Sequence, residues 1–132
     1  MWTYFISTIQ SFGSQGSGHG QFSAPCGVAV DDDGNILVVD AHSNCIHKFT
    51  SDGKFITAVG KRGSLFLEFN STRGIATQEI IYVVDKGNHR IQILNPDLTF
   101  SSSFGSYGSG NGQFISPIDV ACDTTGNVCV VE

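Results

Sequence analysis

The sequence is poor in the patterns that build helices and membrane spans. No window keeps the apolar i, i+3, i+4, i+7 spacing of an amphipathic helix for three turns without a glycine or proline. The longest apolar runs hold four or five residues, far fewer than a membrane span needs. The N-terminal residues lack the basic flank and the long apolar core of a signal peptide. These absences predict an all-β chain that makes no membrane contact.

Signatures of metal and cofactor sites are also missing. The four cysteines form no CxxC pair, lie within or beside apolar runs, and have no histidine at a zinc-site spacing. This pattern predicts buried, reduced thiols and a cytoplasmic protein. Residues 31–33 begin like a calcium-binding loop, but Ile36 and His42 stand where that loop needs glycine and glutamate. We therefore expect a hairpin turn at this segment, and no metal or cofactor.

What the sequence does contain is an internal repeat. Residues 13–22 and 105–114 are identical at eight of ten positions and lie 92 residues apart. A diverged copy lies midway, where Gly60 and Phe69 match the glycine and phenylalanine at the two ends of those strings. A period near 45 residues with several short β-type runs in each copy predicts the blades of a β-propeller.

An acidic residue recurs with the same period. Asp40, Asp85 and Glu132 each end an apolar run, at spacings of 45 and 47 residues. Acidic side chains at such positions accept hydrogen bonds from backbone N–H groups of the following turn. We expect this local structural role rather than a ring of functional carboxylates.

Short apolar runs alternate with Gly, Asn and Asp turn signals inside each copy. The expected strands are residues 28–30, 36–39, 46–49 and 55–59, then 74–77, 80–84, 91–94 and 100–104, then 118–122 and 127–131. Residues 4–12 align with the outer strands. The chain is thus expected to hold two full four-stranded blades, an N-terminal outer strand and half a C-terminal blade, in repeats at about 12–58, 59–103 and 104–132.

Length adds a constraint on the architecture. Closed propellers use roughly 4 to 8 blades, and 132 residues are too few to supply them. The sequence therefore predicts part of a larger propeller. Open blade edges would expose unpaired strands and apolar faces, so we expect self-association through these edges.

The second copy resembles the NHL repeat, which takes its name from an Asn-His-Leu run. Residues 85–90 read Asp-Lys-Gly-Asn-His-Arg and follow the apolar run at 80–84. The approach through residues 12–22, followed by residues 25–31, is similar to the start of the same repeat. The resemblance implies an NHL-type propeller, six-bladed in relatives. The loops most resemble the C-terminal NHL domain of tripartite-motif ubiquitin ligases.

In those ligases the propeller binds RNA or protein while a separate RING domain carries out the ubiquitin chemistry. The resemblance thus implies a non-catalytic module that recruits a protein, single-stranded RNA or both through one face, but not DNA. Such a module would contribute to ubiquitin-dependent degradation or post-transcriptional regulation. Two alternatives remain: a protein-only scaffold or sensor domain, and a fragment of a peptidyl-hydroxyglycine amidating lyase. That zinc enzyme needs convergent histidines, whereas the corresponding slots here hold Cys26, Arg73 and Ile118.

The distribution of charge along the sequence indicates candidate ligand-binding residues. The net charge of −5 and isoelectric point near 5.1 argue against nucleic-acid binding over the whole surface, because phosphate contacts need positive charge. Five of the seven basic residues nevertheless lie between positions 61 and 90. Aromatic side chains such as Tyr107 and Phe66 offer stacking surfaces for bases. The predicted contacts are Arg73 first, then Lys61, Arg62, Lys86 and Tyr107.

Overall fold

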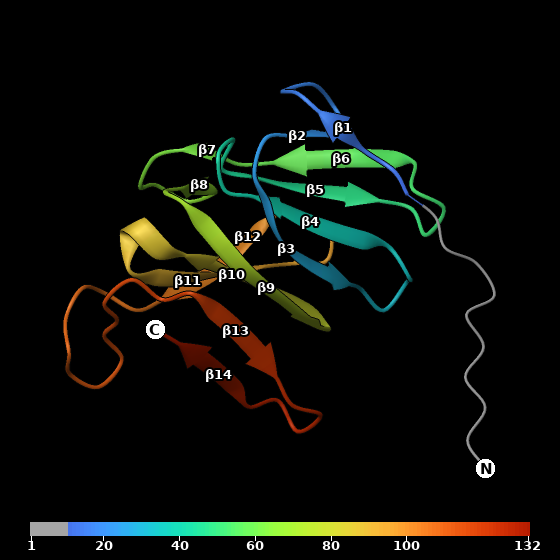
Figure 1. The fold of residues 1–132 in the computed structure, drawn as a ribbon. Coiled ribbons are helices and arrows are strands. Elements are labelled where there is room, and N and C mark those ends of the chain that lie inside the picture. The colour runs from blue at the N-terminus through green and yellow to red at the C-terminus, as the bar shows by residue number, and fades with distance from the viewer. Residues whose placement is uncertain (1–10) are drawn as a thin grey trace, which may run out of the picture.

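The computed structural model describes residues 11–132, and they form a row of antiparallel β-sheets (Figure 1). The strand predicted at residues 4–12 falls almost wholly outside the described residues. Two sheets have four strands and a third is a two-stranded hairpin, as the repeat predicted. Among the described residues, no helix has the length and apolarity needed to cross a membrane.

Each sheet is built from strands that are consecutive in the sequence. The first contains β3 (Pro25–Val30), β4 (Ile36–Asp40), β5 (Cys45–Phe49) and β6 (Phe55–Val59). The second contains β9 (Thr72–Gln78), β10 (Ile80–Asp85), β11 (Arg90–Leu94) and β12 (Phe100–Phe104). The third contains β13 (Asp119–Cys122) and β14 (Val128–Val131). We call these sheets blades 1, 2 and 3.

A crossover loop leads into the inner strand of each blade, and the loops of blades 2 and 3 start from the outer strand of the blade before. We define them as residues 13–24, 60–71 and 105–118. The first two contain short parallel pairs, β1 (Ser14–Gln15) with β2 (Gln21–Phe22) and β7 (Lys61–Arg62) with β8 (Glu68–Phe69), and the third has a single bridge from Tyr107 to Phe114. Sequence patterning did not predict these pairs, because two residues are too few to show a period.

The inner strands β3, β9 and β13 lie side by side (Figure 1), and glycine allows their close approach. A Cβ atom on Gly27 would lie 2.6 Å from the carbonyl oxygen of Arg73. Gly74 donates its N–H to the carbonyl of Ile118 at 3.1 Å, and a Cβ on Gly74 would meet the carboxylate of Asp119. These two glycines therefore serve strand packing rather than a turn.

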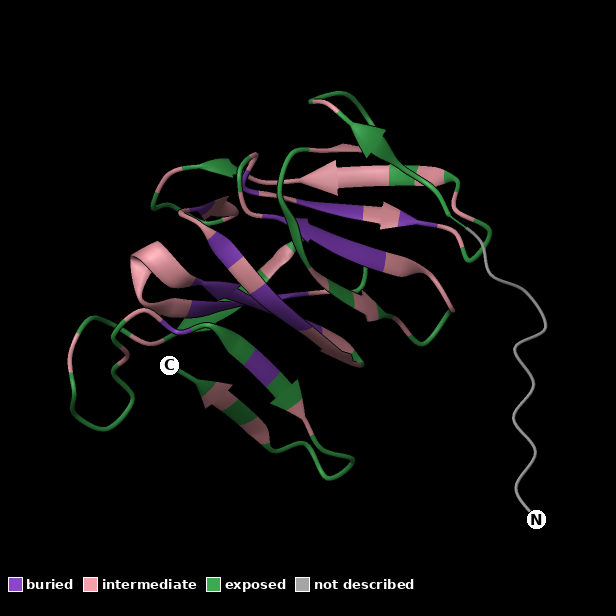
Figure 2. Ribbon diagram, viewed as in Figure 1, coloured by how far each residue is buried: buried purple, intermediate pink, exposed green. Residues whose placement is uncertain are grey.

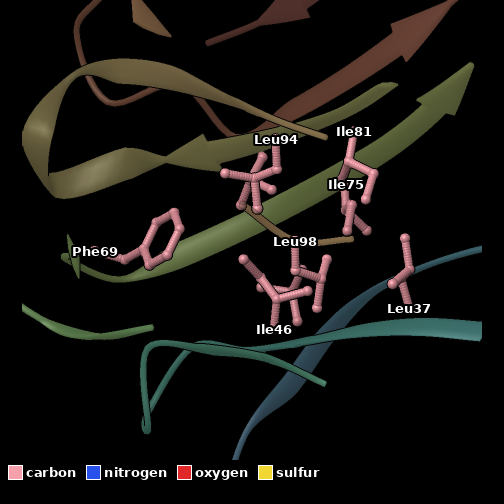
Figure 3. Packing of buried hydrophobic residues seen from close by; sticks show 9 residues of the cluster. Leu37, Ile46, Phe69, Ile75, Ile81, Leu94 and Leu98 are labelled. Atoms are coloured by element: carbon pink, nitrogen blue, oxygen red, sulfur yellow. The ribbon is translucent and has the colours of Figure 1, made fainter. Parts of the chain in front are cut away.

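Buried apolar side chains fill the space between blades 1 and 2 (Figure 3). The middle strands carry most of the buried residues (Figure 2), since both of their faces are covered. The core cluster is Leu37, Val39, Ile46, Phe69, Ile75, Ile81, Val83, Leu94 and Leu98. A smaller cluster of Val84, Ile91 and Val120 joins blade 2 to blade 3.

The repeated glycine and phenylalanine touch each other in every copy. Gly60 has a φ of 112°, and a Cβ there would lie 3.1 Å from the ring of Phe69. Gly13 faces Phe22 and Gly105 faces Phe114 in the same way, each glycine with positive φ. Only glycine combines this backbone conformation with room for the ring, which explains why the two residues recur together.

The cysteines correct one expectation. Cys26 and Cys129 are exposed, and Cys45 and Cys122 are half-buried, so the prediction of buried thiols is wrong for the first two. Cys26 lies on an inner strand, and Cys129 lies on β14, which has no further strand beside it in the described hairpin. A pattern of apolar neighbours shows that a strand is present, but it does not show which strands lie at an edge.

Candidate binding face

The antiparallel strands give the row of blades two distinct ends. The crossover loops and the β4–β5 and β10–β11 connections lie at one end, which we call the crossover face, and the tight turns lie at the other, which we call the turn face (Figure 1). All five predicted ligand-binding residues map to the crossover face. Arg73 is near the start of β9, Lys61 and Arg62 form β7, Lys86 begins the 3-10 turn η1 (Lys86–Asn88), and Tyr107 is in the third crossover loop.

The two faces differ sharply in charge. On the crossover face the basic residues are Lys61, Arg62, Arg73, Lys86 and Arg90, and the acidic ones are Asp40, Glu68, Asp85, Asp119 and Glu132. On the turn face the basic residues are Lys48 and Lys54, and the acidic ones are Asp31, Asp32, Asp33, Asp52, Glu79, Asp97 and Asp123. The formal charge of −5 therefore falls on the turn face. A polyanion is repelled there and meets a balanced surface on the crossover face.

The recurring carboxylates anchor the crossover loops. Asp40 accepts hydrogen bonds from the backbone N–H groups of Ser23 at 2.7 Å and Ala24 at 3.0 Å, and Asp85 accepts one from Asn70 at 2.8 Å. Glu132 accepts one from the crossover loop of blade 3. Burial raises the pKa of Asp40, but its backbone N–H donors outweigh burial and lower the pKa below its ordinary value.

The expected bonding to the following turn is present only in part. Asp40 also accepts from the N–H groups of His42 and Ser43, at 3.0 and 3.3 Å. The bond that all three carboxylates share runs instead to a crossover loop that is distant in sequence. Their common role is thus to hold the loops of the crossover face.

Blade 2 surrounds its carboxylate with side-chain donors. Asp85 is fully buried and accepts from Asn88 at 2.9 Å, from the Nε of Arg90 at 2.8 Å and from Gln92 at 3.3 Å. The Arg90 guanidinium also donates to the carbonyl of Leu65 at 2.7 Å, and Gln92 donates to the carbonyl of Glu68 at 2.7 Å. Arg90 therefore has a structural role, and we do not include it among the candidate ligand-binding cations.

Blade 1 lacks this set of donors. Ser43, Cys45 and His47 occupy the positions of Asn88, Arg90 and Gln92, in the order of the strand register. The Ser43 hydroxyl and both ring nitrogens of His47 are buried without a hydrogen-bond partner among the described residues. Burial lowers the pKa of His47, which favours its neutral form. The crossover loop of blade 2 is consequently held by hydrogen bonds to more side chains than the crossover loop of blade 1.

A second contact links each blade to the next. The Asn44 Oδ1 accepts the N–H of Ser71 at 2.7 Å, and the His89 Nδ1 accepts the N–H of Ser116 at 3.0 Å. Asn44 and His89 occupy the same repeat position and share a left-handed backbone, with φ of 56° and 55°. His89 thus links blades 2 and 3 through a hydrogen bond.

This hydrogen bond between the blades predicts unequal effects of two substitutions at position 89. His89→Ala is expected to lower the free energy of unfolding by about 1–2 kcal/mol, because it leaves the Ser116 N–H without an acceptor and places Ala in a left-handed conformation. His89→Asn should retain most of the stability, since asparagine tolerates this conformation and supplies the same acceptor in blade 1. Urea denaturation of both variants measures the difference, and equal losses of unfolding free energy would contradict this role of His89.

Arg73 lies where the inner strands meet the crossover face. It lines a cavity of about 490 Å³ between the three inner strands, together with Cys26, Ile118 and Asp119. Within the described residues, Arg73 forms no ion pair. Asp119 stands where blades 1 and 2 have glycine, and sequence reasoning missed it, although this departure of the third copy from the repeat was visible in the sequence.

The other predicted residues lie in separate loops of the face. Lys61 forms an ion pair with Glu68 at 3.3 Å, whereas Arg62 and Lys86 form none among the described residues. Tyr107 is exposed and packs edge-on against His89, with ring centroids 4.9 Å apart. The structure therefore gathers the five residues on one face without placing them around one pocket.

Comparison with known proteins identifies the repeat. A family model described as the NHL repeat matches residues 22–49, which span most of blade 1 and the end of its crossover loop. The repeats of this chain are NHL repeats. The predicted all-β, NHL-type partial propeller is confirmed.

The curated relatives that the chain matches are much longer proteins. Over 125 residues the chain is 33% identical to Protein brain tumor of Drosophila melanogaster, covering 92% of this chain and 12% of that protein. The B-box type zinc finger protein ncl-1 of Caenorhabditis elegans is 32% identical, with coverage of 92% and 14%. The E3 ubiquitin-protein ligase TRIM71 of Rattus norvegicus is 45% identical over 47 residues, 36% of this chain and 6% of that protein. The chain thus spans a small fraction of each of these relatives.

Solved structures support the propeller fold. Virginiamycin B lyase from Staphylococcus aureus matches with a TM-score of 0.61 at 14% identity, covering 83% of this chain and 35% of that one. A streptogramin B lyase matches with a TM-score of 0.57 at 13% identity, covering 82% and 40%. At such identities the likeness concerns the fold alone.

Proposed function

We propose that these NHL repeats are a non-catalytic recruitment module whose crossover face binds single-stranded RNA. The observation that carries the proposal is the distribution of charge. Arg62, Arg73 and Lys86, which have no acidic partner among the described residues, all lie on the crossover face, while the turn face carries the net negative charge. Phosphate contacts supply most of the affinity for nucleic acid, so this face is the one that can bind it.

The mechanism is rigid display of side chains. Buried carboxylates and the bonds around Asp85 hold the crossover loops in place, so little order has to be gained on binding. Arg73, which lines the inner-strand cavity, would contact a phosphate, and the exposed ring of Tyr107 would stack on a base. No step of this mechanism needs a metal, a cofactor or a nucleophile.

In the complete protein the module would recruit RNA or a substrate protein for a tripartite-motif-like ubiquitin ligase in the cytoplasm. The support is similarity: one relative is an E3 ubiquitin-protein ligase and another is a B-box zinc finger protein. A protein ligand is the second candidate. The acidic balance of the chain and the exposed apolar side chains of its crossover loops favour it.

Titration with a random single-stranded RNA pool at two salt concentrations tests the RNA proposal. We expect binding that weakens with salt, and Arg73→Glu should abolish most of it, because a charge reversal repels the phosphate that Arg73 contacts. Lys54→Glu is the matched control. It makes the same charge change at an exposed site on the turn face and should leave binding unchanged.

Two results would count against the proposal. No binding at low salt removes RNA as the ligand and leaves the protein partner as the working hypothesis. Equal losses from Arg73→Glu and Lys54→Glu would show that only the overall charge matters, so that no particular face is used.

A further inference from the structure

The crossover loop of blade 2 exposes two large apolar side chains in succession. Leu65 is 69% exposed and Phe66 is 67% exposed. This loop lies between two described blades, so its exposure does not come from an open side of the row. The exposed Val28 and Val131, by contrast, lie on the first and last blades. Leu65 and Phe66, with the neighbouring cations Lys61 and Arg62, form what we call the loop patch.

The repeat shows that the fold does not require these side chains. Blades 1 and 3 have Gly-His-Gly at 18–20 and Gly-Asn-Gly at 110–112 in place of residues 65–67. The loop backbone makes the same bond in each case. The N–H of the first residue donates to the side chain three positions later. The donor–acceptor distance is 2.9 Å in blade 1, 3.1 Å in blade 2 and 3.0 Å in blade 3. Blade 2 therefore adds apolar side chains to a turn that folds without them.

The loop patch is held rigidly in place. The ring of Phe66 stacks on Phe100 with centroids 4.2 Å apart and planes inclined by 18°, so one ring face is covered and the other is open. The carbonyl of Leu65 accepts from Arg90 at 2.7 Å, and the N–H of Leu67 donates to Gln92 at 3.0 Å. An exposed apolar pair on a fixed backbone is typical of a binding anchor, because little conformational entropy is lost when a partner docks.

The charge left unpaired beside the apolar pair is positive. Glu68 is the acidic residue of this loop, and its carboxylate is occupied by Lys61 at 3.3 Å and by the N–H groups of Ser64 and Leu65 at 3.2 and 3.1 Å. Arg62 is exposed and forms no ion pair among the described residues. A partner that packs on the apolar pair therefore gains from acidic residues beside its own apolar group.

We propose that the loop patch docks an acidic peptide segment of a protein partner. A large apolar side chain of the segment would pack on Leu65 and the open face of Phe66, and carboxylates of the segment would pair with Arg62. A peptide fits better than RNA, since an aliphatic side chain such as Leu65 gives no stacking surface to a base. This site is separate from Arg73 and goes beyond the proposed RNA-binding function.

A fluorescein-labelled peptide pool tests the docking. In the probe pool Asp or Glu alternates with Leu, Phe or Trp, and in the reference pool Lys replaces the acids. We expect the acidic pool to bind at least about tenfold more tightly than the basic pool. Leu65→Gly with Phe66→Asn, which gives these two positions the residues that blade 3 has at 110 and 111, should abolish that binding, and Arg62→Glu should weaken it about tenfold. Arg73→Glu should leave it unchanged.

Blades 1 and 3 predict that the double variant folds, and an unchanged thermal unfolding midpoint would verify this. The proposal is overturned if the acidic pool binds no better than the basic one, or if the folded double variant binds as well as the parent. It is also overturned if the double variant loses RNA binding and the parent binds no peptide, since the patch would then be a stacking surface for bases. Failure of RNA binding alone leaves the peptide result intact, so the two proposals fail separately.

Discussion

Asp85→Ala is expected to lower the free energy of unfolding by about 3–5 kcal/mol, the range found when one partner of a buried ion pair is removed. The Asp85 carboxylate is fully buried, and the Arg90 Nε lies 2.8 Å from it. Its removal leaves the Arg90 guanidinium, Asn88 and the N–H of Asn70 short of an acceptor in a region that water reaches poorly. Urea denaturation followed by circular dichroism measures the loss.

Asp32→Ala is the matched control for this prediction. It removes the same charge from an exposed hairpin turn, and it should change the stability by less than about 0.5 kcal/mol. If both variants lost equal stability, net charge rather than the buried network would explain the effect. If neither lost stability, the assigned role of Asp85 would be wrong.

Phe69→Ala is expected to cost a similar amount, about 3–5 kcal/mol, because the ring is wholly buried in the core between blades 1 and 2. Truncation removes the apolar contacts and leaves a cavity that the surrounding strands can fill only in part. The contact with Gly60 would also be lost. Thermal and urea unfolding of the variant provide the measurement.

Phe114→Ala gives a comparison at the same repeat position. Phe114 is half-buried and packs against the smaller cluster between blades 2 and 3. Its truncation should therefore cost clearly less than that of Phe69. A loss as large as for Phe69 would mean that the position matters through the local contact with its glycine, which both rings share, rather than through the core.

The crossover loops show where prediction from sequence was limited. The recurring glycine and phenylalanine were visible as a repeat, but their mutual contact was not, because it depends on a positive φ at glycine and on a chain reversal nine residues long. The carboxylates were correctly placed at strand ends. Their shared acceptor role toward the crossover loops became evident only in the structure, since those loops precede them by 15 to 17 residues.

The candidate site shows the same division. The sequence singled out Arg73 and the cluster of cations in the second copy, and the topology put all of them on one face. Arg90 was not among the predicted contacts, and the folded chain shows the reason, because it brings the guanidinium to Asp85 and to two loop carbonyls. The segregation of the net negative charge onto the turn face was also invisible, since acidic residues from distant turns meet there only after the blades stack.

The sequence by itself determined the fold class, the period of the blades, the order of their strands and the family. These follow from local information: alternating apolar residues, turn residues and a motif that recurs every 45 to 47 residues. The tertiary structure decided which residues are free to bind a ligand. Exposure, ion pairing and the common orientation of loops arise from contacts between blades, and these contacts join residues too far apart in the sequence for local patterns to specify them.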